Sequence, residues 1–422
     1  MTSDPVAVWC GSVSVTESQL RERGRRLAGA LGAASGRLVP IVDNNRVRAL
    51  LTAWGVRASG GIPLVGDDRW NVTHWSELRQ LAVGAVLSPD SAWAAFSSGS
   101  SGSPRVILRS EQSWCASFSA VTELMELTSS DCVYLPAPLS SSLSLFSVAH
   151  ARSVGAAVAL PRAHSFSPAD LEHATLLHAT PHALRTIVEA IEAGAIRHHL
   201  HSALVGGAHL DVGVRERAQA LGIRVVSYYG AAELSFVAVD TDGLGHRPFP
   251  GVELRVTDGE LWVRSPYLAS EYLASGYLGT DGALRQSPGG WATVGDLVVL
   301  DRADRLHFRG RVDGAILTAA ATVVPEEVES ALRSIDGIED AIVLGLANGG
   351  VGALVSVVIE TTPGSAVPSV RHLREEARSR LAPSHLPRRW YWTERLPRTP
   401  AGKPARAQVR LAIENGEVNR LD

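Results

Sequence analysis

Short apolar runs alternate with helical patterns through the first 250 residues of the chain. Apolar side chains recur at helical spacing over residues 17–33, and Thr16 precedes them as a helix cap. Residues 37–43 predict a strand, and residues 45–60 predict a helix that ends in glycine. This alternation of strands and helices predicts an α/β fold built in layers.

From about Val252 the apolar positions alternate with a period of two. Residues 251–273 and 292–312 carry Asp-Gly and Asp-Arg turns, which predicts antiparallel hairpins. After Asp313 the pattern predicts a helix, two strands and a second helix. We therefore expect two domains. Residues 1–311 would form a large N-terminal domain of layered mixed sheets with helices and a small β-barrel-like antiparallel part, and residues 312–422 a small C-terminal α+β domain.

Composition excludes several classes of protein. A chain of 422 residues, 45% hydrophobic and 20% charged, is typical of a soluble globular protein with more than one core. A net charge of -3 gives no support for nucleic acid or an anionic membrane as partner. The scattered Cys10, Cys115 and Cys132 favour reduced thiols, and neither a signal peptide nor a membrane-spanning run is evident. We expect a cytoplasmic protein.

A serine- and glycine-rich loop separates two short apolar runs, 93–96 and 106–108. Between two buried strands such a loop can direct backbone N–H groups and hydroxyls towards an anion. It is not the common P-loop, because its basic residue follows a proline and a strand comes next instead of a helix. The prediction is a phosphate-binding loop made of Ser97, Ser98, Gly99, Ser100, Ser101, Gly102 and Arg105.

Three further segments carry residues suited to nucleotide chemistry. Glu233 lies in a loop just beyond the predicted strand that ends at Gly230, and a carboxylate near a phosphate loop is a candidate Mg²⁺ ligand. Asp296 follows a glycine at a turn, where its carboxylate can accept both hydroxyls of a ribose, and Arg311 precedes another turn. Lys403 lies on a Pro/Gly-rich loop, which by itself is typical of a solvated surface charge.

In this order the segments resemble the adenylate-forming superfamily of acyl-CoA synthetases, peptide-synthetase adenylation domains and luciferases. The resemblance covers nearly the whole chain, and "LVGGAHLD" also resembles the family's glycine turn at the adenine. The matching motifs are SSGSSGSPR at 97–105, YGAAE at 229–233, GDL at 295–297 with GRVD at 310–313, PEEVE at 325–329 and PRTPAGK at 397–403.

The resemblance implies that ATP and an acid react to an acyl-adenylate and pyrophosphate. It places Lys403 between the carboxylate and the α-phosphate, the serine-glycine loop on the departing phosphates, and Mg²⁺ on Glu233. Asp296 and Arg311 would hold the ribose. The nucleotide would further contact Gly206, Gly207, Ala208, Tyr229 and Gly230, and the acid pocket would include Ser141, His178, Tyr228 and Ala231. Asp313 matches a hinge about which the C-terminal domain moves between adenylation and a second half-reaction, commonly with CoA.

The sequence departs from the family pattern at several positions. Arg105 replaces a lysine and keeps its charge, whereas Ala232 replaces a threonine and loses its hydroxyl. Leu317, Ala320 and Thr322 replace the lysine, the glycine and the basic residue of the loop that lines the pantetheine tunnel in the family. These last changes weaken the case for a CoA step.

Three hypotheses follow. The leading one is an acid–CoA ligase that uses ATP and Mg²⁺ to activate a modest-sized acid, with aromatic acids as candidates. The second passes the adenylate to a different acceptor, a carrier protein or an amine, and includes ATP-dependent nitrite activation for diazotisation of an aryl amine. The altered loop favours this second class. The third is a degenerate nucleotide-binding scaffold, against which the retained Lys403, Asp296, Glu233 and Arg311 argue.

Overall fold

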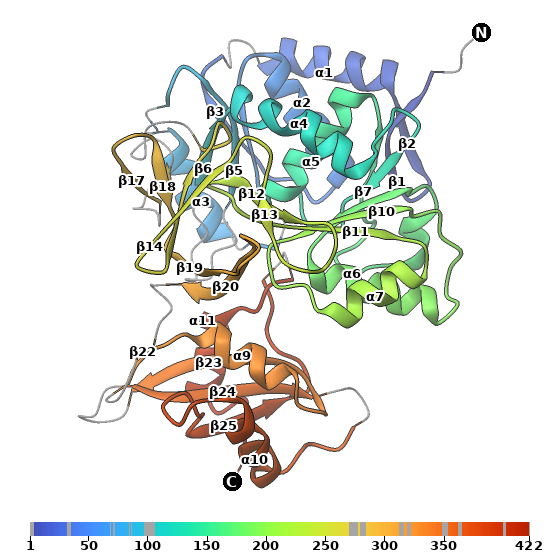
Figure 1. Cartoon of the computed structure of the whole chain (residues 1–422). Coiled ribbons are helices and arrows are strands. Elements are labelled where there is room, and N and C mark those ends of the chain that lie inside the picture. The colour runs from blue at the N-terminus through green and yellow to red at the C-terminus, as the bar shows by residue number, and fades with distance from the viewer. Residues whose placement is uncertain are drawn as a thin grey trace.

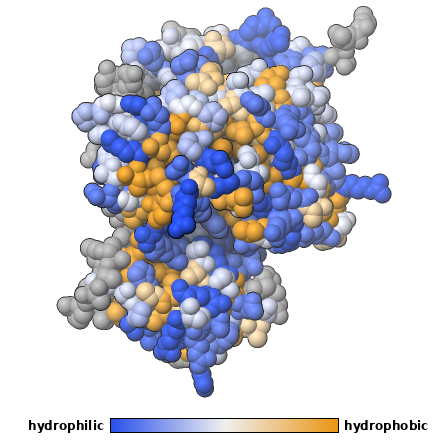
Figure 2. Space-filling model, viewed as in Figure 1, coloured by the Kyte–Doolittle hydropathy of each residue, from blue (hydrophilic) through white to orange (hydrophobic). Residues whose placement is uncertain are grey.

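The chain folds into a large N-terminal body and a smaller C-terminal body, which a computed structural model shows one above the other (Figure 1). The molecule narrows between the two bodies in the space-filling view (Figure 2). The structure describes residues 4–421 apart from 32–34, 68, 71, 84, 86, 97–105, 270–276, 279–283, 312–315, 319–321, 348–352, 362–364 and 400–401.

A nine-stranded sheet forms the centre of the N-terminal body, in the order β13-β12-β11-β10-β9-β7-β8-β1-β2. The strands from β11 to β1 are parallel, and β2, β12 and β13 are antiparallel additions at the two edges. The carboxyl ends of the parallel strands therefore meet at one edge, where loops carry functional side chains. The strands are β1 (Val6–Cys10), β2 (Val13–Thr16), β7 (Cys132–Tyr134), β8 (Ala157–Ala159), β9 (Leu176–Ala179), β10 (Ser202–Gly206), β11 (Arg224–Ala231), β12 (Ser235–Asp240) and β13 (Arg247–Pro248).

A second, five-stranded sheet has the order β16-β6-β5-β4-β3. Its strands are β3 (Leu38–Ile41), β4 (Ile62–Val65), β5 (Ser91–Phe96), β6 (Val106–Ser110) and β16 (Tyr277–Leu278). Because β5 and β6 pair antiparallel, the loop 97–105 connects two paired, largely buried strands, as predicted from its apolar flanks.

Helices fill the space between these sheets and cover their outer faces. Helices α4 and α5 contact strands of both sheets, so they form the layer between them. Helices α6 and α7 cover the other face of the large sheet, and α3 packs against the small one. The helices are α1 (Glu17–Leu31), α2 (Arg46–Ala58), α3 (Val72–Val83), α4 (Glu111–Met125), α5 (Ser142–Val154), α6 (Pro181–Glu192) and α7 (Val212–Ala220), with a 3₁₀ turn at Pro168–Leu171.

A six-stranded antiparallel sheet completes the N-terminal body. Its hairpins turn at Asp258-Gly259 and at residues 301–305, as the period-two pattern predicts. The strands are β14 (Glu253–Thr257), β15 (Glu260–Arg264), β17 (Arg285–Ser287), β18 (Trp291–Thr293), β19 (Asp296–Leu300) and β20 (Leu306–Arg311).

The C-terminal body is a four-stranded sheet, β23-β24-β25-β26, with α9 and α10 on one face and α11 on the other. A two-stranded hairpin, β21-β22, precedes it. The elements are β21 (Ile316–Leu317), β22 (Thr322–Val323), α9 (Pro325–Arg333), β23 (Ile338–Ala347), β24 (Ala353–Thr361), α10 (Val370–Arg380), β25 (Arg389–Thr393), α11 (Arg406–Glu414) and β26 (Asn419–Leu421).

The predicted fold class is confirmed: the chain is a mixed α/β protein with a large N-terminal and a small C-terminal domain. The boundary between residues 311 and 312 stays a prediction, since 312–315 lie outside the described residues. No helix in the described part of the chain is long and apolar enough to cross a membrane. All three cysteines are free thiols.

Candidate active site

Lys403 lies on a tight turn that the C-terminal domain presents to the N-terminal domain. The Thr399 N–H donates to the Lys403 carbonyl at 2.7 Å, and the Lys403 N–H donates to Thr399 Oγ1 at 3.2 Å. Gly402 adopts φ +78°, a left-handed conformation that glycine takes without steric cost. Arg398, at the base of the turn, pairs with Asp340 at 2.8 Å and Glu360 at 2.9 Å. The turn is therefore anchored to the C-terminal sheet.

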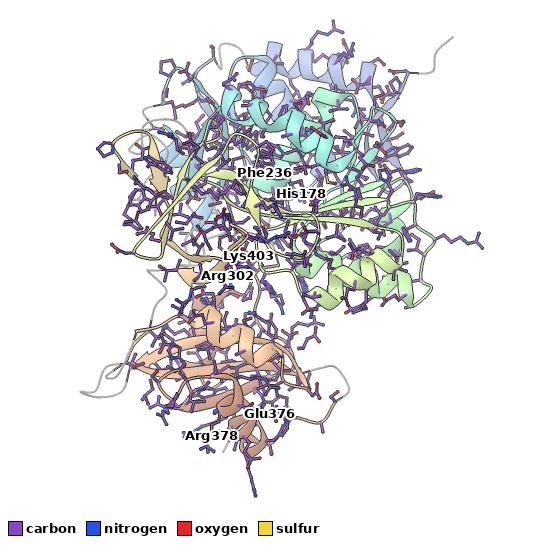
Figure 3. The ribbon with its side chains drawn as sticks, viewed as in Figure 1. His178, Phe236, Arg302, Glu376, Arg378 and Lys403 are labelled. Carbon is purple, nitrogen blue, oxygen red and sulfur yellow. The ribbon has the colours of Figure 1, made fainter. Side chains whose placement is uncertain are left out.

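The Lys403 side chain lies over Gly207, at the carboxyl end of β10. A Cβ atom built on Gly207 would lie 3.1 Å from Lys403 Cε and 3.6 Å from Nζ. Next to it, Gly402 packs against Thr180 and His182 at the start of α6. Figure 3 shows Lys403 where the two domains meet, whereas Glu376 and Arg378 lie towards the far end of the C-terminal domain. The fold thus brings together two segments, Gly206–Ala208 and Lys403, that the sequence analysis assigned to one site.

Two further contacts join the domains around this turn. Arg185 on α6 forms an ion pair with Glu339 of the C-terminal domain. His182 keeps an exposed side, and partial burial beside the turn, reinforced by the charges of Arg398 and Arg185, lowers its pKa from 6.5 to about 4. A neutral imidazole therefore lies in the interface at neutral pH. Neither Arg185 nor His182 belongs to a sequence motif that would have pointed to this contact.

Tyr229 and Asp296 form a second part of the site. The Tyr229 hydroxyl donates to Asp296 Oδ2, and its ring packs on Phe308 with centroids 4.0 Å apart. Asp296 begins β19 and is the register partner of Arg311 at the end of β20. Three residues predicted for the nucleotide site thus lie together at one end of this hairpin and the adjoining edge of the large sheet.

Two glycines on the large sheet are required by their neighbours. A Cβ atom at Gly206 would overlap the Tyr228 ring, and one at Gly230 would overlap the Ser235 carbonyl oxygen. Side chains at these positions would displace the strand ends that carry Gly207 and Tyr229.

Glu233 is 7% exposed and lies on the short loop between β11 and β12. Arg109, from β6, supports this loop: it donates to the Ala232 carbonyl at 2.6 Å and to the Tyr267 carbonyl. Burial lowers the pKa of Arg109 to about 9, and Glu233 opposes that shift by its charge. No motif marks Arg109, although a buried arginine directly after the apolar run 106–108 is an unusual feature.

A buried hydrogen-bonded chain lies between α5 and the large sheet. Ser147 Oγ contacts His178 Nδ1, and His178 Nε2 lies 3.0 Å from the Tyr228 hydroxyl. Burial, together with the nearby His150, lowers the pKa of His178 to about 3. Burial has the opposite effect on the Tyr228 hydroxyl and raises its pKa. The imidazole is therefore neutral at neutral pH, and Phe236 packs on the Tyr228 ring with centroids 4.6 Å apart. A cavity of about 20 Å³, enough for about one water molecule, lies behind His178.

The remaining predicted residues fall into two groups. Ser141 caps α5: its Oγ accepts from the Ser144 N–H at 3.2 Å and donates to the Pro138 carbonyl at 2.8 Å. Ala208 lies in the loop from β10 to α7, and Ala231 ends β11. The phosphate-binding loop, namely Ser97, Ser98, Gly99, Ser100, Ser101, Gly102 and Arg105, lies outside the described residues, as do Asp313 and Ala320.

The arrangement combines one primary amine, a tyrosine–aspartate pair and a buried carboxylate at the carboxyl edge of a parallel sheet. Lys403 is the only lysine in the chain, since the other 39 of its 40 Lys and Arg residues are arginine. A compact ammonium group on a mobile stem can contact two anionic reactants at once. The site is therefore suited to joining two negatively charged molecules.

Comparison with known proteins agrees with this chemistry. The family model described as "AMP-binding enzyme" matches residues 66–273, and "AMP-binding enzyme C-terminal domain" matches residues 327–403. An uncharacterized acyl–CoA ligase of Bacillus subtilis is 27% identical over 350 residues, which cover 76% of this chain and 68% of the relative. A probable 2-succinylbenzoate–CoA ligase of Mycobacterium tuberculosis is 29% identical over 349 residues, covering 80% and 88%.

Among solved structures, the amide bond synthetase of Marinactinospora thermotolerans superposes with a TM-score of 0.81 at 25% identity and covers 96% of both chains. Fold and site together define an enzyme that activates an acid as its adenylate. The chain belongs to the adenylate-forming superfamily of AMP-binding enzymes, and it is an adenylate-forming ligase.

Proposed function

We propose that this ligase activates a modest-sized carboxylic acid with ATP and transfers the acyl group to the thiol of CoA. The observation that carries the proposal is the contact of Lys403 with Gly207, which puts the only lysine at the carboxyl edge of the large sheet. Similarity to acyl–CoA ligases over most of the chain supports CoA as the acceptor.

In the first half-reaction an oxygen of the acid attacks the α-phosphorus of ATP. The P–O bond to the β-phosphate breaks, and pyrophosphate leaves with its electron pair. Lys403 offsets the negative charges that otherwise keep the carboxylate and the α-phosphate apart, and it holds them in line. In the second half-reaction the thiol attacks the acyl carbon, AMP departs, and the thiol proton is released.

The ribose of ATP would lie against Asp296, with the Tyr229 hydroxyl fixing that carboxylate and Arg311 alongside. The adenine would lie along Gly206–Ala208, where the absence of side chains leaves room for close approach. The loop 97–105 would hold the β- and γ-phosphates through its hydroxyl and N–H groups.

Glu233 fits a Mg²⁺ site, because it is a buried carboxylate on a loop held by Arg109, and Mg²⁺ prefers oxygen ligands. Bound there with ATP, Mg²⁺ would neutralise charge on the departing pyrophosphate. Ala232, which replaces the family's threonine, leaves its carbonyl to Arg109 and contributes no hydroxyl.

The chain Ser147–His178–Tyr228 would form the polar end of the acid pocket. Both ring nitrogens of the neutral His178 are engaged within this chain, so the imidazole brings no positive charge and positions the hydroxyls of Ser147 and Tyr228. We expect the Tyr228 hydroxyl to bind a hydroxyl or carbonyl of the acid rather than a second carboxylate. The aromatic surroundings of Phe236 and Tyr228 favour an aromatic body.

A second candidate function is transfer of the acyl group to an amine. Leu317 and Thr322 lie opposite each other in the hairpin β21-β22, where the family has basic residues, and Ala320 replaces its glycine. Leucine and threonine at these positions offer no charge to the pantetheine arm. Similarity to an amide bond synthetase, at 25% identity, supports this alternative.

The proposal is tested by measuring pyrophosphate release from ATP with each member of a panel of acids. The panel contains aryl and short-chain acids and includes 2-succinylbenzoate and nitrite. Each acid is assayed alone, with CoA and with a set of amines. We expect an aromatic monocarboxylic acid to give acid-dependent release that CoA accelerates and that ends in a thioester. Acceleration by an amine and not by CoA would establish the second candidate. No release with any acid would contradict both.

A further inference from the structure

A groove of about 610 Å³ lies in the N-terminal domain, apart from the residues around Lys403. It is formed by the β1-β2 turn, by α1, by the start of α2 and by the segment after β8. Its volume falls within the range of roughly 300–1,000 Å³ that is typical of small-molecule sites. It shares no residue with the nucleotide and acid sites described above.

The groove combines guanidinium groups with apolar side chains. Its arginines come from segments far apart in the sequence, so the fold gathers them: Arg23, Arg26, Arg46, Arg48 and Arg162. Val13, Leu27 and Leu51 contribute apolar surface between them, and Val13 is 53% exposed. A cationic groove with an apolar wall is suited to an anion that carries an apolar body.

Carboxylates balance only part of this charge. Arg26 pairs with Glu22 at 2.6 Å, Arg162 with Asp170 at 3.2 Å, and Arg48 donates to Asp43 at 2.7 Å. Within the described residues, neither Arg23 nor Arg46 pairs with a carboxylate. Five arginines and three carboxylates leave a net charge of +2 in the groove.

Two of the guanidinium groups are held in place. Arg46 donates to the Pro161 carbonyl at 2.7 Å and lies 2.9 Å from His164 Nδ1. The stem of Arg162 crosses Gly11, where φ is +58° and a Cβ atom would overlap it. A fixed guanidinium fork binds phosphate oxygens at a smaller entropic cost than a free one.

We propose that this groove binds a soluble organic diphosphate. Arg23 and Arg46 contact its phosphates, because they are the two arginines whose charge no carboxylate offsets. The apolar part lies against Val13, Leu27 and Leu51. The groove has the volume of a small-molecule site and is partly open to solvent, so an anionic lipid surface is the competing occupant that the experiment must separate.

Calorimetric titration with geranyl diphosphate tests the proposal. α,β-Methylene-ATP is kept saturating throughout, so that the nucleotide site is occupied. We expect one binding event, weakened about tenfold or more in the double variant Arg23→Gln/Arg46→Gln, since both guanidinium groups that would contact the phosphates are removed. Arg371→Gln is the matched control: this arginine, 87% exposed on α10, lies outside the groove, and its loss should leave binding unchanged. Thermal unfolding confirms that each variant is folded.

Equal affinity in the double variant and the wild type would overturn the site. Inorganic tripolyphosphate binding as tightly as geranyl diphosphate would overturn the role of the apolar wall. Binding to phosphatidylglycerol vesicles without binding to geranyl diphosphate would overturn the small molecule in favour of a lipid surface. None of these outcomes depends on the adenylation activity.

Discussion

The Lys403 side chain rests on Gly207, so that a Cβ atom at Gly207 would come within 3.1 Å of Lys403 Cε. This contact joins the loop between β25 and α11 of the C-terminal domain to the carboxyl end of β10. Everywhere else the chain uses arginine as its base, including position 105, where the family has lysine. We therefore expect position 403 to require a compact ammonium group and a guanidinium to be sufficient at position 105.

Substitution of Gly207 by alanine should slow pyrophosphate release about a hundredfold, because displacing a reacting group by about 1 Å can cost that much. The added methyl group would push Lys403 aside. Gly207 also has φ +93°, which disfavours any side chain. Gly222→Ala separates the two effects: it has φ +81° and nothing within 4 Å, so it should cost about 1 kcal/mol of stability and no activity. Equal loss in both variants would show that backbone strain alone is responsible.

The Arg185–Glu339 ion pair should favour the domain arrangement in which Lys403 reaches the site. The two side chains are 28% and 29% exposed, so the pair contributes about 0.5–1 kcal/mol to docking of the C-terminal domain. Its loss should therefore slow adenylation about two- to fivefold. Arg185→Ala is compared with Arg217→Ala, which removes an ion pair with Glu192 inside the N-terminal domain. Thioester formation from added acyl-adenylate should not slow in either variant. A slower second step in Arg185→Ala would contradict this assignment.

Loss of the Tyr229 hydroxyl should weaken ATP binding, since it leaves Asp296 without one of its donors. A hydrogen bond to a carboxylate contributes about 1.5 kcal/mol or more, so Tyr229→Phe should raise the KM for ATP about tenfold and change that for the acid little. Tyr391→Phe, in the C-terminal sheet, is the control. An unchanged KM for ATP would remove Tyr229 and Asp296 from the nucleotide site.

Acid should undock the C-terminal domain through His182. Its pKa is about 4 in the docked structure and 6.5 when solvated, so the docked state binds fewer protons between these values. The stability that depends on neutral His182 is complete above pH 6.5 and is lost as the pH falls towards 4. Pyrophosphate release should therefore decline over this window more steeply in the wild type than in His182→Gln. Parallel profiles would contradict the assignment.

The pattern of apolar positions predicted the layers and hairpins because each element carries its own period and turn residues. The pattern of apolar positions did not predict the helices α4 and α5. Residues 141–147 are mostly serine, which has a modest helix propensity, and α5 forms because sheets on both sides bury residues such as Leu145 and Phe146. Such helices form because they are buried between other elements, and this burial cannot be read from the local sequence pattern.

Motifs assigned Asp296, Glu233 and Lys403 to the site, and the roles of these residues there stay predictions. No motif could assign Arg109, His182 and Arg185, because they act through partners more than one hundred positions away in the chain, such as Ala232 and Glu339. For Ser141 the family resemblance implies a place in the acid pocket. In the structure its hydroxyl caps the N-terminus of α5. A contact between Ser141 and the acid therefore stays a prediction.

The most direct test of the account is the rate of acid-dependent pyrophosphate release by Lys403→Ala, with the best acid from the panel. Lys403→Arg keeps the charge and serves as the second variant. The proposed role of Lys403 predicts a loss of about a hundredfold or more in the alanine variant and incomplete rescue by arginine. Thioester or amide formation from added adenylate should keep the wild-type rate. Unchanged pyrophosphate release by Lys403→Ala would contradict the role of this lysine and the account built on it.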